Sequence, residues 1–561
     1  MTKTDVVTGQ EWRWVLIVGV AALVVTSIPY LIGWQQETPE RVFEGCILLI
    51  DDCYSYLAKM RQGAEGAWLF HIAYTPESHL STFFFPFHLA LGKVATLLPG
   101  SVSDLTTRMI WIYHGARVVF GMAFLLTVYR FLSVFTAQAK VRRWAWLMVT
   151  FGGGLGWLLV MLGRTNWLGT PPLDFYLPEG FALLVLYGFP HIAAAQSLLL
   201  WGILCLLRAW QVCPTSDVQG QQSEAQRLEH ATHNAQYALH IQELKWAMLA
   251  GLLWLAMGVI VPFYVAVTWA VMAAAWLGQG IRERRVGWRK GLVAGGAVFA
   301  SAPIVLYSAW VFTSDPVYVI WAAQNLILSP HPLHYLAAYG IPLALAAFAV
   351  RDVWYDEGPA WLALAWVVLV PVLIYLPFNL QRRLVNGVQV PLSLLAAWGA
   401  MRLWRSGKRW LVALSLATMV PTGFILLAGS SAMMFARPPI IFRDAAEIAA
   451  LDWMSERVRS DDVVLAAYET GNYLPVRMVA RAFLGHGLET VDVGEKETAV
   501  ARFFGAGASD AWRQRLLAQY GIDYVFWGPW ERQLGAFDLR TAPYLREVYQ
   551  AEGYAIFEVR R

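Results

Sequence analysis

The stretch CILLIDDCYSYLAKMRQG, residues 46–63, places two adjacent aspartates, Asp51 and Asp52, directly after an apolar run. The residues that follow have Tyr, Leu, Ala and Met at helix-compatible spacing, so we expect a surface helix that ends at Gly63. In the first turn of a helix, exposed N–H groups and the dipole favour negative charge. Two like charges side by side oppose this, and a divalent cation or a cationic partner would relieve the conflict. The simpler alternative is that the pair only caps the helix.

The chain around this stretch has the composition of a membrane protein. Of its 561 residues, 58% are hydrophobic and only 15% are charged, whereas a soluble chain carries about a quarter charged residues. A bilayer core of about 30 Å requires roughly 20 apolar residues per helix. We therefore expect a mainly α, polytopic transmembrane bundle of about eleven spans, at 13–33, 108–133, 144–163, 181–209, 245–260, 262–278, 291–312, 334–350, 359–377, 384–404 and 409–430. The net charge of +4 is too small to indicate nucleic acid as a partner.

Basic clusters between these runs predict the orientation in a cytoplasmic membrane. KVRR (140–143), RERRVGWRK (282–290) and RLWRSGKR (402–409) all face the cytoplasm if the N-terminus does and each run crosses once. The first external loop then covers about 34–107. This threading requires the apolar stretch 82–100 to lie as a helix at the membrane surface. If that stretch crosses, every later loop changes side.

The composition changes after Ala436, where the predicted transmembrane module, residues 1–436, gives way to a soluble extracytoplasmic domain, residues 437–561. Strand-like DVVLAAY (462–468), DYVFWG (523–528) and YAIFEV (554–559) accompany helix-like DAWRQRLLAQYG (510–521). Alternating strand and helix signals predict a small α/β domain. Within it, YETGNYLP (468–475) and FLGHGLET (483–490) resemble Gly-rich turns, and we interpret Glu469, His486 and Glu489 as loop residues, with acceptor binding as the alternative.

The four cysteines are too few for a disulfide framework, and none has the spacing of a zinc site. Cys46 and Cys53 flank the acidic pair. We expect two free thiols there, with a local bridge as the alternative if the loop faces an oxidising compartment.

The loop DDCYSYLAKMRQGAEGAWL (51–69) resembles the first extracytoplasmic loop of the GT-C glycosyltransferase superfamily. These polyprenyl-phosphate-dependent membrane enzymes include protein O-mannosyltransferases and aminoarabinose transferases. Relatives have an acidic pair after the first span, an aromatic-rich surface helix and a Gly-any-Trp step, here Gly66-Ala67-Trp68. The resemblance implies that Asp51 is the catalytic carboxylate and Asp52 its partner.

Further along, FFFPFHLALGKV (83–94) resembles the family's apolar juxtamembrane helix, and Arg108 or Arg117 its second-span arginine. The chain departs from the family pattern in one respect. No convincing equivalent of the later acidic residue is present, and Asp174 or Glu179 matches only by position.

The chemistry implied by the family explains these residue types. Transfer from a lipid-phosphate sugar needs a base that takes the proton of an acceptor hydroxyl as it attacks the anomeric carbon, and an ionised Asp can do this. Direct displacement of a β-linked donor inverts that carbon. The leaving phosphate needs cationic or metal stabilisation. Arg382 and Arg383, external against the positive-inside trend, suit the donor phosphate, with snorkelling to lipid head groups as the alternative.

Other external polar residues complete the predicted site. A divalent metal ion would bind Asp51, Glu77 and His79, whereas the alternative is that these are hydrogen-bonded loop residues. We expect substrate contacts from Tyr56, Glu77, His191, Gln324, Asn325 and His331. Such residues also collect in any membrane-interface loop.

The sequence therefore predicts a glycosyltransferase that moves a hexosyl or pentosyl group from a polyprenyl-phosphate donor to an extracytoplasmic acceptor, in contact with membrane lipid. Two alternatives stay open. A transporter or flippase would show inverted repeats and mid-span ionisable residues. A non-catalytic assembly protein would tolerate loss of the acidic pair.

Overall fold

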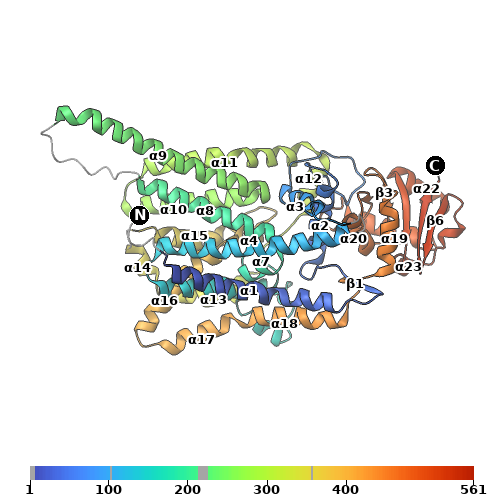
Figure 1. Cartoon of the computed structure of the whole chain (residues 1–561), viewed down its shortest axis with the longest axis horizontal. Coiled ribbons are helices and arrows are strands. Elements are labelled where there is room, and N and C mark those ends of the chain that lie inside the picture. The colour runs from blue at the N-terminus through green and yellow to red at the C-terminus, as the bar shows by residue number, and fades with distance from the viewer. Residues whose placement is uncertain (1–6, 101–103, 213–224, 356–357, 561) are drawn as a thin grey trace. The chain divides into compact units, whose positions relative to one another are not determined.

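The computed structural model describes residues 7–100, 104–212, 225–355 and 358–560. The chain is mainly helical, and its packing divides it into two compact units (Figure 1). Unit 1 combines residues 1–24, 117–309 and 327–425, and unit 2 combines 25–116, 310–326 and 426–561. Unit 2 therefore contains both the acidic pair and the C-terminal sheet. The division into a transmembrane module and a soluble domain at residue 436 stays a prediction.

The described helices include eight that are long and apolar enough to cross a membrane. They are Gly9–Gln35 (α1), Leu105–Phe135 (α4), Ala139–Met161 (α5 with α6), Pro190–Gln211 (within α8), Ile241–Ile260 (the C-terminal part of α9), Phe263–Glu283 (α10), Trp288–Ser314 (α11) and Arg409–Ala436 (α17 with α18). Two shorter apolar helices are α13 (Pro332–Ala347) and α15 (Ala360–Leu373). These lengths and compositions indicate a multi-pass membrane protein. The count of about eleven spans stays a prediction.

Three of the predicted spans are broken. The first ends as α5 (Ala139–Phe151) at Gly152 and resumes as α6 (Gly156–Met161). The second is divided into α7 (Ala182–Gly188) and α8 (Pro190–Val212), and the third into α17 (Arg409–Met419) and α18 (Pro421–Ala436). Pro190 and Pro421 begin the second helix of their pairs, because proline cannot donate the backbone bond that would continue the preceding one. Apolar run length alone does not reveal these breaks.

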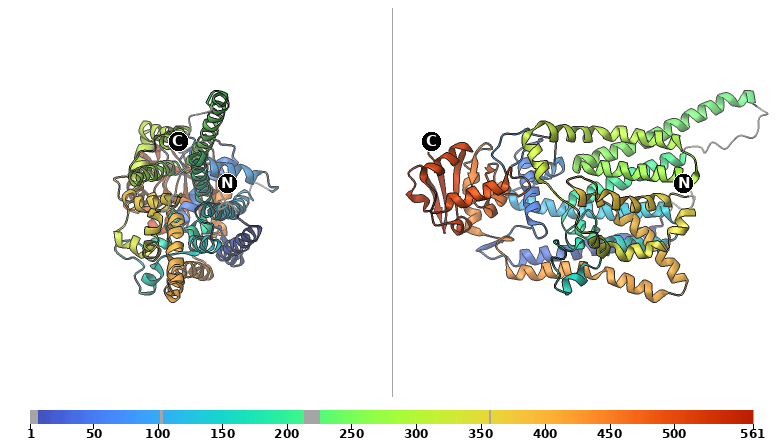
Figure 2. Two further views of the ribbon diagram at one scale, coloured as in Figure 1. Left: turned by 90° about the vertical axis from the view of Figure 1, so that its left-hand side faces the viewer. Right: turned by 180° about the vertical axis from the view of Figure 1, so that it is seen from behind.

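Within unit 1 the helices lie side by side (Figure 2). Helix α8 packs along α9 (Ala225–Ile260), α10 along α15, and α16 (Gln389–Arg405) along α5 and α13. A buried ion pair supports this bundle. Arg142 Nε donates to Glu11 Oε1 at 3.0 Å, and the Tyr129 hydroxyl donates to the same oxygen at 2.6 Å. This network joins α1, α4 and α5.

Unit 2 contains a five-stranded mixed sheet in the order β4-β3-β5-β7-β6 (Figure 1). Its strands are β3 (Val463–Leu465), β4 (Arg481–Ala482), β5 (Ile522–Trp527), β6 (Leu545–Ala551) and β7 (Tyr554–Val559). Strand β3 is parallel to β4 and β5, and β7 is antiparallel to β5 and β6, with Val525 opposite Phe557. The predicted α/β domain is thereby confirmed.

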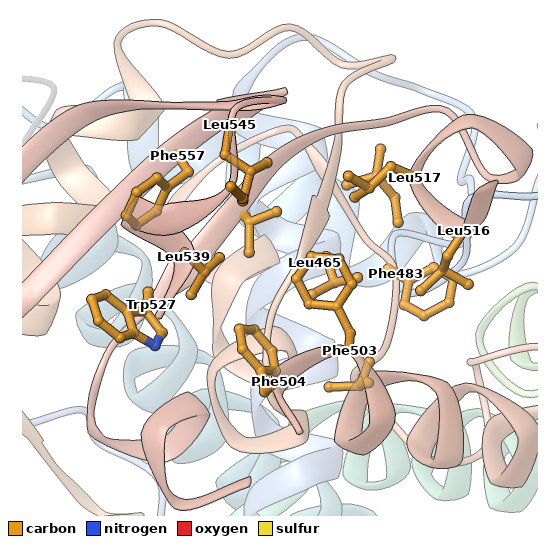
Figure 3. Packing of buried hydrophobic residues seen from close by; sticks show 14 of the residues in the cluster. Leu465, Phe483, Phe503, Phe504, Leu516, Leu517, Trp527, Leu539, Leu545 and Phe557 are labelled. Atoms are coloured by element: carbon orange, nitrogen blue, oxygen red, sulfur yellow. The ribbon is translucent and has the colours of Figure 1, made fainter. Parts of the chain in front are cut away.

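The core of this sheet explains why strands β3, β5 and β7 are mostly apolar. Leu465, Trp527 and Phe557 point to one face and pack with Phe503, Phe504, Leu516 and Leu517 (Figure 3). These last four belong to α21 (Val493–Phe504) and α22 (Asp510–Gln519). Val464, Phe526 and Ile556, which alternate with the first set, are also buried. A sheet covered on both faces gives continuous rather than alternating apolar runs.

The first loop contributes α2 (Ile50–Ala64), α3 (Pro86–Thr96) and β1 (Arg41–Phe43), and β1 pairs antiparallel with β2 (Phe442–Asp444). Helix α3 has 11 residues, a rise of about 16 Å, which is half of a bilayer core. It packs closely on α2. A Cβ at Gly92 would lie 1.8 Å from the Met60 carbonyl oxygen, so only glycine permits this approach.

Cys46 and Cys53 form a disulfide, so the expectation of two free thiols is wrong. The chain turns here, with positive φ at Gly45, directly before Cys46, and at Leu49, between the two cysteines. This turn brings their Cα atoms to 6.0 Å, within the range that a bridge requires. A spacing of seven residues does not by itself show such a reversal.

Candidate functional site

The acidic pair lies in the first turn of α2 but does not cap it. The N-cap residue is Leu49, in a left-handed conformation, and no side chain makes a capping hydrogen bond. The interpretation of the pair as a simple cap is therefore not supported. The carboxylates instead reach residues of the C-terminal segment of unit 2.

Asp51 is held by two side chains of α20 (Tyr468–Arg477). Asn472 Nδ2 donates to Asp51 Oδ1 at 2.7 Å, and the Tyr468 hydroxyl donates to Asp51 Oδ2 at 3.1 Å. The two donors are four residues apart and share one helix face. Burial and the Asp51 charge raise the pKa of Tyr468, which keeps its hydroxyl protonated as a donor. Both oxygens of Asp51 are thus fixed in direction.

Asp52 is the more open carboxylate and faces a histidine. Its Oδ1 lies 3.5 Å from His486 Nε2, and the Asp52 side chain is 39% exposed against 7% for His486. Burial lowers the pKa of His486, but Asp52 and Glu489 raise it further, so the net shift is upward. A protonated His486 is the cationic partner that two adjacent aspartates require. Interpreting His486 as an ordinary loop residue missed this contact.

A buried ion pair lies beneath the acidic pair on the same face of α2. Lys59 Nζ is 2.7 Å from Glu489 Oε1, and the two side chains are 2% and 6% exposed. Ser55 Oγ donates to the same oxygen at 2.7 Å. Burial alone would raise the pKa of Glu489, but Lys59 and His486 lower it below its usual range. This pair attaches α2 to the 486–489 loop that carries His486.

The predicted metal ligands Asp51, Glu77 and His79 do not form a cluster. Glu77 pairs with Lys496 at 2.8 Å. His79 uses both ring nitrogens, since Nδ1 lies 2.7 Å from the Glu77 carbonyl oxygen and Nε2 accepts from Ile72 N at 2.8 Å. Throughout the described residues, no group of three or more His, Cys, Asp or Glu side chains could hold a metal ion. The hydrogen-bonded alternative describes Glu77 and His79.

Three predicted substrate residues in unit 2 have structural contacts. Gln324, at the end of α12 (Pro316–Gln324), donates to the Thr490 carbonyl oxygen and accepts from Asp492 N, both at 2.8 Å. Asn325 is the C-cap of this helix. Tyr56 stacks on His88 with ring centroids 4.7 Å apart. Gln324 therefore positions the loop that follows His486 and Glu489.

The predicted phosphate ligands belong to unit 1, in the short helix η2 (Gln381–Val385). Arg383 forms an ion pair with the buried Glu179. Arg382 Nη1 donates to the Tyr176 hydroxyl at 3.2 Å and its guanidinium covers the Tyr176 ring. Its Nε has no hydrogen-bond partner among the described residues. Arg382 is thus the better placed of the two to bind an anion.

The remaining predicted residues of unit 1 have different surroundings. His331 accepts from Leu333 N at 3.3 Å and caps α13, and His191 is buried at the start of α8. Asp174 accepts from Gly154 N, Gly156 N and the Thr422 hydroxyl. It therefore fixes the break between α5 and α6 and has a structural role.

No protein-family model and no curated protein matches the sequence. The oligosaccharyltransferase of Archaeoglobus fulgidus in its apo form is a structural match at 13% identity, with a TM-score of 0.51 over 95% of this chain and 73% of that one. The same enzyme, AglB, in complex with an inhibitory peptide and a dolichol-phosphate matches at 13% identity, with a TM-score of 0.52 over 92% and 70%. Tethered with an acceptor peptide, it matches at 12% identity, with a TM-score of 0.51 over 98% and 74%.

Structural matches at 12 to 13% sequence identity establish the fold of this chain but not the reaction that it catalyses. The resemblance that the loop at 51–69 indicates is confirmed at that level: the chain has the fold of the archaeal oligosaccharyltransferase, a GT-C glycosyltransferase.

Proposed function

We propose that this chain is a glycosyltransferase that moves a sugar from a polyprenyl-phosphate donor to an acceptor outside the cytoplasm, with Asp51 as the general base. The observation that carries the proposal is the Asp51 carboxylate, held at both oxygens by Asn472 and Tyr468. A carboxylate that serves only packing would not need two dedicated donors from a segment more than 400 residues later. A general base, in contrast, must hold its carboxylate oxygen in a fixed orientation toward the acceptor hydroxyl.

The reaction balances with the residues at hand. An Asp51 oxygen accepts the proton of the acceptor hydroxyl while that oxygen attacks the anomeric carbon. The bond from this carbon to the phosphate oxygen breaks, and polyprenyl phosphate leaves with the electron pair. With a β-linked donor, the anomeric centre is inverted. Asp52 remains balanced by His486, so the neighbour of the proposed base does not carry an uncompensated negative charge.

Arg382 is the proposed ligand of the donor phosphate. Its Nε has no hydrogen bond among the described residues, while Tyr176 supports the other side of its guanidinium. A planar guanidinium suits phosphate because it can donate two parallel bonds. The Arg383 charge is offset by Glu179, so Arg383 positions η2. The dolichol-phosphate in complex with the archaeal neighbour supports a polyprenyl-phosphate donor, and the acceptor peptide tethered to that neighbour supports transfer to an acceptor.

A divalent metal would have only Asp51 and Asp52 as adjacent ligands in the first loop. Glu77 and His79 are engaged elsewhere, with Lys496 and with backbone groups. Because the set is incomplete, no step of the proposed reaction depends on a metal ion.

The proposal is tested by transfer of radiolabelled sugar from a polyprenyl phosphate in proteoliposomes. Asp51→Asn keeps the shape and the Tyr468 contact but removes the base, so we expect a loss of about 10² to 10⁴ in rate. Asp461→Asn, at an exposed carboxylate of the same unit, is the control and should transfer normally. An Asp51→Asn protein as active as this control would refute the assignment. Solute flux through vesicles without an acceptor would instead indicate a transporter.

A further inference from the structure

Unit 2 has a cavity that neither Asp51 nor Asp52 lines. It lies among the end of α1, strand β1, the first turns of α4 and the end of α20, and has a volume of about 320 Å³. Sites for small molecules occupy roughly 300 to 1,000 Å³. The cavity is therefore large enough for one small ring.

One wall of this cavity is aromatic. Trp34 and Trp111 stack with centroids 4.5 Å apart and planes inclined by 14°, and Phe43 meets Trp34 edge-on at 5.7 Å. Trp111 is 53% exposed. The face of an indole carries partial negative charge. It attracts the weakly positive C–H groups on the flat face of a sugar ring.

The polar and charged groups of the cavity include Glu44 and Arg477. Glu44 is 2% exposed and lines the cavity; the buried Tyr473 hydroxyl is near enough to act on its pKa, but no donor reaches Glu44 Oε2 with hydrogen-bond geometry within the described residues. Arg477 also lines the cavity, and it uses Nε and Nη2 for Asp452, at 3.0 and 2.6 Å. A buried polar atom without a partner is costly and rare in native proteins. A ligand hydroxyl would give Glu44 Oε2 a donor, and its oxygen could accept from the Arg477 guanidinium.

The charged residues around the cavity disfavour an anion or a cation as its ligand. Glu37 and Glu44 both line it, and although burial raises the pKa of each, carboxyl groups offer a phosphate no favourable charge. Arg477 lines it as well, and Arg443 acts on Glu44 from nearby, so a cation has little advantage. A hydrocarbon chain would leave Glu44 without a partner. A neutral ring that bears hydroxyl groups meets each of these conditions.

We propose that this cavity is a second, non-catalytic binding site for a pyranose sugar ring, stacked on the Trp34–Trp111 pair with hydroxyl groups on Glu44 and Arg477. The site goes beyond the proposed transfer reaction and does not depend on it. Helix α20 connects the two places, since Asn472 contacts Asp51 while Arg477 lines the cavity. The sugar can come from a free saccharide or from the head group of a glycolipid.

Both sources can be tested on the full chain. For free sugars, saturation-transfer NMR titrations use methyl glucopyranoside, methyl mannopyranoside and methyl galactopyranoside. The protein is kept in lauryldimethylamine oxide, because a maltoside detergent presents pyranose rings itself. For glycolipids, native mass spectrometry counts the monoglucosyl diacylglycerol that the protein retains from nanodiscs, against phosphatidylglycerol.

Four variants make the test specific to this cavity. Glu44→Gln removes a charged acceptor and Trp111→Leu removes the stacking face, and each should weaken sugar binding about tenfold or more. Trp310→Leu is the matched control, since Trp310 is 55% exposed in the same unit. Asp51→Asn should bind sugar like the parent chain, which separates this site from the proposed active site.

Saturation by a free sugar that both cavity variants weaken supports the proposal, as does selective glycolipid retention that they abolish. Glu44→Gln and Trp111→Leu change different kinds of side chain, so a folding defect in one variant does not decide the test. Thermal unfolding shows whether each variant is folded. The proposal is overturned if neither probe binds, or if Glu44→Gln and Trp111→Leu bind like the Trp310→Leu control. It is equally overturned if only Asp51→Asn loses binding.

Discussion

The buried pair of Lys59 and Glu489 should be the main attachment of α2 to the loop that carries His486. Replacing Lys59 by Met keeps the length of the side chain but leaves the Glu489 carboxylate, 6% exposed, with Ser55 as its remaining close donor. Because both side chains are almost fully buried, solvent screening does not reduce the effect. Breaking one partner of such a pair costs about 3 to 5 kcal/mol. We expect Lys59→Met to destabilise unit 2 by that amount.

Pulse proteolysis of the full chain across a urea series measures this change. The matched control is Lys93→Met, the same substitution at a lysine of α3 that lies over the Trp68 ring at 4.4 Å, where we expect about 0.5 to 1 kcal/mol. In the double variant Lys59→Met, Glu489→Gln no unpaired charge remains. Its cost should therefore fall below the sum of the single costs by about 2 kcal/mol. A Lys59→Met cost no larger than the control, or strictly additive costs, would refute the reasoning.

Other predictions concern the groups around the acidic pair. Because the pKa of His486 is raised in the folded chain, protonated His486 stabilises the fold fully below pH 6.5, and this contribution is lost as the pH rises through the folded-state pKa. The free energy of unfolding measured from pH 6 to pH 9 should therefore fall. His486→Gln should make this fall with pH smaller. Tyr468→Phe removes one donor to Asp51 and should lower the transfer rate with little change in the KM for the donor, while an altered KM alone would contradict the positioning role. Reduction of the Cys46–Cys53 disulfide, or a Cys46→Ser, Cys53→Ser variant, should cost about 2 to 3 kcal/mol for so short a loop, and unchanged unfolding would contradict it. Because His486 offsets the acidic pair, transfer should survive EDTA, and a loss restored by one divalent ion would show that a metal replaces this histidine.

Much of the fold follows from local patterns. The strands at 462–468, 523–528 and 554–559 and the helix after Asp51 were expected from runs of apolar residues, and each lies where predicted to within a few residues. The breaks at Pro190 and Pro421 were not expected, because a long apolar run can continue across a helix boundary. The Cys46–Cys53 bridge depends on a chain reversal that no local pattern indicates.

The site was only half predictable, for a physical reason. Asp51 and Asp52 stand out because charge directly after an apolar run is costly in a membrane protein. Their partners Tyr468 and Asn472 lie more than 400 residues away in the chain. They also occur in YETGNYLP, where Gly471 and Pro475 suggest a turn. In the structure this segment is the helix α20, and Gly471 is needed because a Cβ there would lie 1.8 Å from the Leu484 carbonyl oxygen.

The central claim is that the carboxylate of Asp51, held by Tyr468 and Asn472, is the base of the proposed sugar transfer. A cryo-electron microscopy structure of the full chain with a non-transferable phosphonate analogue of a polyprenyl-phosphate sugar tests it most directly. We predict that the anomeric carbon faces Asp51, with room for one acceptor hydroxyl within hydrogen-bond reach, about 2.6 to 3.2 Å, of an Asp51 oxygen. An analogue whose anomeric carbon is turned away from Asp51 would contradict the account.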